Sequence, residues 1–86
     1  MSIQDAAPAT DVYLARHVAT MHDNGEQVQL ILDGDQVWTV ESYDFAPPVV
    51  AAEYCRYRFN VTRPATGEQG CTPWLISDAF LMVVAK

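Results

Sequence analysis

The chain has 86 residues, of which half are apolar and 19% are charged, and its eleven acidic and five basic side chains leave a net charge of −6. A chain of this length forms one domain at most, and the composition is that of a globular protein rather than a disordered one. Because the net charge repels phosphate at long range, it disfavours general nucleic-acid binding, and it keeps a small protein soluble.

The N-terminal segment "MSIQDAAPAT" lacks the positively charged and apolar regions of a secretory signal. No apolar run approaches the ~20 residues that cross a bilayer. We therefore expect a cytoplasmic protein with no membrane attachment. Residues 1–9, with three alanines around Pro8, are expected to form a flexible N-terminal arm, and residues 10–86 are expected to form a single domain.

Residues 11–22 follow a helical period. Their apolar side chains fill one half of a helical wheel: Val12, Leu14, Ala15, Val18, Ala19 and Met21. Thr10 or Asp11 would cap the start of this helix, and Asn24 or Gly25 would end it in a left-handed conformation. The Asn-Gly pair is also a hairpin signal, so an all-β meander or a small barrel stays open as the alternative.

A hairpin is expected next, with strands at 27–32 and 36–43 around the turn DGD at 33–35. A three-residue loop pairs Leu30 with Trp38 and puts both on the buried face. A two-residue loop would turn Trp38 to the opposite face, because a slip of one residue flips every side chain. Burial of the indole favours the three-residue loop.

The second half of the chain predicts two further strands. Pro47 and Pro48 end the hairpin, and a long strand is expected at 49–62. Its alternation puts Cys55, Tyr57, Phe59 and Val61 on one face and Tyr54, Arg56, Arg58, Asn60 and Thr62 on the other. A loop follows at 63–73. The apolar segment 79–85 predicts a central strand, with a helix capped by Ser77 or Asp78 as the competing interpretation.

Together these segments predict a two-layer α+β domain. One N-terminal helix would pack on a mainly antiparallel sheet of about four strands, which is the simplest way to bury its apolar half.

No group of residues predicts catalysis, a metal or a cofactor. His17 and His22 would project about 140° apart on a helix and cannot share one metal. The spacing of Cys55 and Cys71 matches no zinc or CxxC pattern, and a disulfide between them would require export. Nothing local places either thiol near a histidine, as a nucleophile pair requires. We therefore expect a non-enzymatic protein.

The segment "CRYRFNVTR" at 55–63 holds three of the five basic residues, Arg56, Arg58 and Arg63. In a plain solvent face, Arg56 and Arg58 would pair with acids on neighbouring strands, such as Glu41 or Glu53, at little energetic gain. An RNA-reading sheet exposes its aromatic residues beside its basic ones, whereas here the alternation turns Tyr57 and Phe59 away from the arginines and leaves only Tyr54 beside them.

Tyrosine and arginine are enriched at the centres of protein interfaces. Tyr54, Arg56 and Arg58 are therefore candidate binding residues, and Trp74, beside a proline in a loop, is a further candidate for an exposed contact. Tyr13 and Arg16 on the predicted helix form a second candidate patch. We expect a module that binds another protein or itself; the alternative is a binder of nucleic acid or an anionic ligand that uses Arg56, Arg58 and Arg63.

Overall fold

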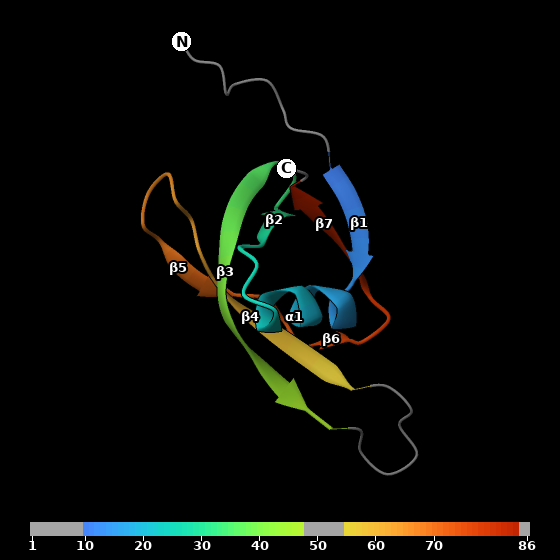
Figure 1. The fold of residues 1–86 in the computed structure, drawn as a ribbon. Helices are drawn as coiled ribbons and strands as arrows, with labels where there is room; N and C mark the ends of the chain where they lie inside the picture. Colours follow the sequence, from blue (N-terminus) through green and yellow to red (C-terminus); the bar gives the residue numbers. More distant parts are fainter. Residues whose placement is uncertain (1–9, 48–54, 85–86) are drawn as a thin grey trace.

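The computed structural model describes residues 10–47 and 55–84, which form one helix and seven strands (Figure 1). The elements are β1 (Thr10–Leu14), α1 (Ala15–Asp23), β2 (Gln29–Leu32), β3 (Gln36–Ala46), β4 (Arg56–Thr62), β5 (Gln69–Cys71), β6 (Leu75–Ile76) and β7 (Phe80–Val84). The predicted α+β class is confirmed, but the expectation of about four strands is wrong. The predicted arm, residues 1–9, lies outside the described residues. No helix in the described part of the chain is long and apolar enough to cross a bilayer.

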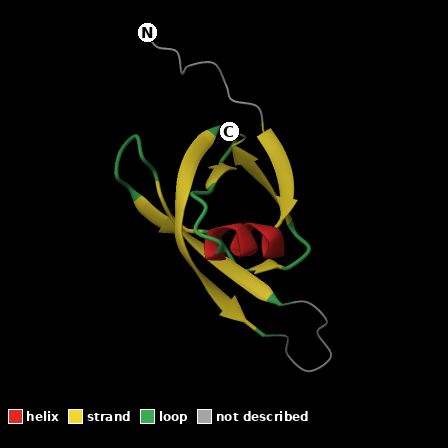
Figure 2. Ribbon diagram, viewed as in Figure 1, coloured by secondary structure: helices red, strands yellow, loops and turns green. Residues whose placement is uncertain are grey.

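The strands form one sheet in the order β1-β7-β2-β3-β4-β5, and β6 pairs with β4 beside β5. Every pair of neighbours is antiparallel. The sheet is open, because β1 and β5 lie at its two ends and do not pair with each other. It bends so that β3 and β4 lie on one side of α1 and β1 and β7 on the other (Figures 1 and 2).

The core lies between α1 and the concave face of this sheet. The helix contributes Ala15, Val18 and Ala19, and the strands and the residue before β2 contribute Val28, Leu30, Trp38, Val40, Phe59, Val61, Leu81 and Val83. The outer face of the sheet, which points away from α1, is not covered by any second layer among the described residues. Within residues 10–47 and 55–84, functional groups on that face are therefore covered by no other element.

The helix is shorter than predicted. It begins at Ala15, after an extended Leu14 that makes no side-chain cap, so the expected caps at Thr10 and Asp11 are wrong. Residues 10–14 form β1 instead, because their pairing with β7 satisfies their backbone groups, and β-branched and aromatic residues suit a strand. The predicted end is confirmed: Asn24 is the C-cap and Gly25 has a φ of +85°.

The hairpin of β2 and β3 has the predicted register. Leu30 pairs with Trp38, and the three-residue loop between the strands places Asp33 at φ +53° and Gly34 at φ +92°. Trp38 is 7% exposed, as the register argument required. The second strand runs further than predicted, to Ala46, after an irregularity in its pairing with β4 between Val40 and Ser42.

The predicted strand 49–62 is described only from Arg56 to Thr62, and residues 48–54 lie outside the described part. Its alternation is confirmed, because Phe59 and Val61 are buried on the helix side. The predicted loop 63–73 contains one short strand, β5.

The C-terminal segment is a strand, β7, and not the competing helix. It lies between β1 and β2, as a central strand should. It is buried on one face only: Leu81 and Val83 are in the core, while Phe80 is 69% exposed and Met82 is 43% exposed. The continuous apolar run therefore reflects an uncovered outer face rather than a strand covered on both sides.

Candidate functional site

Three of the four predicted binding residues come together on the outer face of the sheet. The ring of Trp74 lies over the guanidinium groups of Arg58 and Arg56, with its centroid 4.8 Å and 5.9 Å from their Cζ atoms. The fourth residue, Tyr54, lies outside the described part of the chain. We call Arg56, Arg58 and Trp74 the arginine–tryptophan cluster.

Strand pairing puts the indole over the arginines. In β6, Ile76 pairs with Arg56 and Leu75 pairs with Tyr57, so continuation of this register sets Trp74 opposite Arg58. Residues that face each other across a ladder share one face of the sheet. The indole is 43% exposed and keeps one side open to solvent.

Thr72 holds the segment that carries this tryptophan. Its backbone N–H donates to the carbonyl of Phe59 at 2.9 Å, and its hydroxyl accepts from the N–H of Phe59 at 3.0 Å. The same hydroxyl donates to the carbonyl of Pro73 at 2.9 Å. Thr72 is 5% exposed. No sequence pattern singled out Thr72, and its place before a proline is its only local signal.

Arg58 is paired with Asp44. Its Nη2 and Nε lie 2.9 Å and 3.2 Å from the same carboxylate oxygen, Oδ2. The expected pairing of Arg58 with Glu41 is wrong, because the register between β3 and β4 sets Asp44 directly opposite Arg58. The other expected partner, Glu53, lies outside the described residues. No carboxylate of the described residues pairs with Arg56.

Arg63 is not part of the cluster. It follows the far end of β4, five residues beyond Arg58, which corresponds to roughly 16 Å along an extended strand. It lines a separate hollow with Gln29 and Asp35. The three arginines of the segment 55–63 therefore do not form one basic patch.

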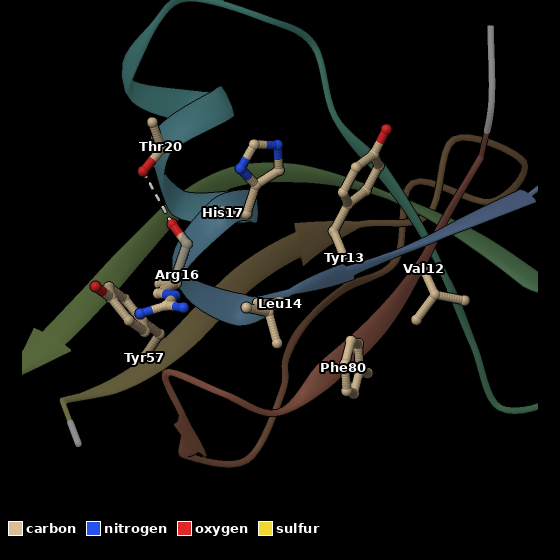
Figure 3. Close-up of a pocket in the computed structure, with 8 residues that line it drawn as sticks. All are labelled: Val12, Tyr13, Leu14, Arg16, His17, Thr20, Tyr57 and Phe80. Atoms are coloured by element: carbon tan, nitrogen blue, oxygen red, sulfur yellow. Dashed lines mark hydrogen bonds between the residues drawn. The ribbon is translucent and has the colours of Figure 1, made fainter. Parts of the chain in front are cut away.

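A second surface feature lies at the open edge of the sheet, along β1 (Figure 3). A depression of about 540 Å³ is lined there by Val12, Tyr13, Leu14, Arg16, His17, Thr20, Tyr57 and Phe80. The rings of Tyr13 and His17 pack with centroids 4.9 Å apart. Tyr13 and Arg16, the second predicted patch, both line this depression, although Tyr13 belongs to a strand and not to the helix.

The helix side of β3 and β4 carries a row of aromatic rings. Phe45, Tyr57, Tyr43 and Phe59 follow one another with centroids 5.4 to 6.0 Å apart. The Tyr43 hydroxyl donates to Asp23 Oδ2 of α1 at 2.8 Å, and this hydrogen bond to the carboxylate, helped by burial, raises the pKa of Tyr43. Burial raises the pKa of Tyr57. Both phenols therefore stay protonated near neutral pH.

Both cysteine thiols are unbonded, with Cys55 half-buried and Cys71 exposed. In residues 10–47 and 55–84, no three His, Cys, Asp or Glu side chains lie close enough to hold a metal ion.

Comparison of the chain with protein-family models, with curated proteins and with solved structures gives no match. The geometry of these surfaces is therefore the basis for proposing a function. An exposed aromatic ring stacked on two cations can contact a partner. The arginine–tryptophan cluster includes no pair of groups arranged for proton transfer or nucleophilic attack.

Proposed function

We propose that this chain is a small non-enzymatic domain that binds another protein through the arginine–tryptophan cluster. The observation that carries the proposal is the position of Trp74, which lies 43% exposed over two arginine side chains on an uncovered sheet face. Tryptophan and arginine are the residues that most often dominate the binding energy of protein interfaces.

The contacts within the cluster support this function, because they hold its side chains in place before a partner arrives. Cation–π contacts hold Arg56 and Arg58 against the indole, and the ion pair with Asp44 also holds Arg58. Side chains that are already ordered lose less conformational entropy on binding. Ile76, 48% exposed and paired with Arg56, adds apolar area beside the cluster.

The charges of the cluster favour a protein over a polyanion. Asp44 neutralises Arg58, Arg63 lies elsewhere, and the chain as a whole carries −6. A phosphate backbone would meet, in a repulsive field, the single cation Arg56, which pairs with no carboxylate of residues 10–47 and 55–84.

Binding of nucleic acid or another anionic ligand is the second candidate. One observation favours it: Trp74 adds an exposed ring beside the arginines, where strand alternation had offered only Tyr54, and such a ring can stack on a base.

Affinity capture from native lysate tests the proposal. The wild-type chain is compared with Trp74→Ala and with the matched control Phe45→Ala, an exposed ring on the opposite face of β3. We expect a protein retained by wild type and by the control but lost by Trp74→Ala, with a Kd at least about 30-fold weaker for the purified pair.

Two results would count against the proposal. If Trp74→Ala and Arg56→Glu retain the same species as wild type, the cluster does not bind it. If the captured species is removed by nuclease and its binding weakens steeply with salt, the second candidate replaces the first.

A further inference from the structure

We propose that two copies of this chain associate by pairing their β1 strands antiparallel, across a two-fold axis at Val12. The proposal concerns a different surface from the arginine–tryptophan cluster and does not depend on it. It rests on the backbone groups at the open edge, on the depression that follows this edge, and on the match between β1 and its own copy.

No strand of residues 10–47 and 55–84 pairs with the open edge of β1. Ala15 donates to the carbonyl of Ala79, its opposite residue in the register of β1 and β7, at 2.7 Å. Because hydrogen-bonded and non-hydrogen-bonded pairs alternate in an antiparallel ladder, Asp11 and Tyr13 direct their backbone groups at β7. Val12 lies between them and directs its N–H and carbonyl away from the sheet, as do Thr10 and Leu14.

The depression along this edge has the form that an added strand requires. Val12, Leu14 and Phe80 line it on the outer side of β1, while Tyr13 and His17 line it on the helix side (Figure 3). An extended strand projects its side chains alternately to both sides. A strand laid along β1 would therefore fill both halves of the depression while pairing with its backbone.

β1 is complementary to itself in one register. When Val12 lies opposite Val12 of the second copy, Thr10 faces Leu14 of the second copy. Thr10, Val12 and Leu14 are the residues of β1 whose backbone N–H and carbonyl groups point outward. The same register sets the two Val12 side chains together on the outer face. Met82, which pairs with Val12 in β7 and is 43% exposed, extends this contact on both sides.

Charge complementarity favours a second copy as the occupant. On the helix side, Asp11 of each chain would face Tyr13 of the other, whose ring packs on His17 next to Arg16. On the outer side Val12, Leu14, Phe80 and Met82 are all uncharged, so no like charges face each other across that part of the contact. Because the two copies are related by a two-fold axis, each of these contacts occurs twice.

The opposite edge of the sheet is less suited to this pairing. β5 has three residues, Gln69–Cys71, with Gly70 at its centre. A short strand with glycine offers few backbone groups and little side-chain area to a partner.

Sedimentation equilibrium of the full chain, from micromolar to millimolar concentration, tests the proposal. We expect a reversible dimer for wild type and at least a tenfold weaker dimer for Val12→Pro. Proline there removes an N–H that faces the open edge and leaves the bonds to β7 in place, so the variant should still fold, which circular dichroism checks. A wild-type chain that stays monomeric, or a dimer that Val12→Pro does not weaken, would overturn the proposal.

A cysteine cross-link tests the register independently. In a background of Cys55→Ser and Cys71→Ser, Val12→Cys should form a disulfide-linked dimer on mild oxidation, since opposed Cα atoms in this pairing lie about 5.5 Å apart. Phe80→Cys is the matched control: it is exposed but lies one strand further from the axis, so it should cross-link much more slowly. Equal rates for the two variants would contradict the pairing. Trp74→Ala should leave the dimer unchanged, which separates this proposal from the proposed function.

Discussion

Phe59→Ala probes whether the centre of the β3–β4 pair holds the domain together. The Phe59 ring is 0% exposed and packs beside Tyr43 and Tyr57, whose ring centroids are 6.0 Å and 6.3 Å away. Its removal forfeits about 1.5–3 kcal/mol of burial and leaves a cavity that packed neighbours only partly fill. We expect the free energy of unfolding to fall by roughly 3–5 kcal/mol, a large share of the ~5–10 kcal/mol typical of a domain this small.

Urea unfolding followed by tryptophan fluorescence measures this loss by linear extrapolation. Phe45→Ala is the matched control, because Phe45 belongs to the same aromatic row but is 53% exposed. It buries only about half of its ring and leaves no closed cavity, so its loss should be near ~1 kcal/mol. If Phe59→Ala proves too unstable to fold, Phe59→Leu should fall between the two. A loss below ~1 kcal/mol for Phe59→Ala, or equal losses for both alanine variants, would refute the assigned core.

Three further outcomes are expected. A double-mutant cycle of Arg58→Ala and Asp44→Ala should give a coupling below ~1 kcal/mol, because both side chains are more than a third exposed; several kcal/mol would contradict this exposure. Tyr43→Phe should lower stability by about 1 kcal/mol at neutral pH. The folded-state pKa of Tyr43 is raised above 10.0, so the Tyr43 phenol contributes fully to the free energy of unfolding below pH 10 and loses this contribution as pH rises through the higher folded pKa. The wild type should therefore lose more stability in that range than Tyr43→Phe, and parallel pH curves for the two proteins would refute this. Gly34→Ala should destabilise the fold by about 1 kcal/mol or more, since Gly34 has φ +92°. Gly70→Ala should change stability by less than ~0.5 kcal/mol, since the added Cβ would meet the Trp38 ring at an ordinary 3.8 Å. Chemical denaturation of both variants measures the difference, and equal effects would contradict the turn geometry.

Local signals in the sequence predicted several elements correctly. The turn at 33–35 set the register of Leu30 and Trp38, and the alternation of 55–62 placed Phe59 inside. Both depend on neighbours within a few residues, and a register error would expose a large aromatic ring to water.

Residues 10–14 show where local signals fail. Their apolar positions fit one half of a helical wheel and also one face of a strand, and only β7, some seventy residues later, selects the strand. The short strands β5 and β6 were missed for a related reason. With three and two residues they are too short to show a period, and they form because β4 offers them a free edge.

For the candidate site too, some features follow from local sequence and others only from the tertiary structure. The sequence by itself determined which residue types stand on the outer face of β4, because side chains alternate along a strand. It also determined the net charge of −6 that disfavours a polyanion as partner. Only the tertiary structure decided which residues meet there. The pairing of β6 with β4 brings Trp74 over Arg58, and the shifted register of β3 makes Asp44 its ion partner. These contacts join residues 14 and 16 positions apart, and their geometry depends on a strand order and a bulge that no local pattern encodes.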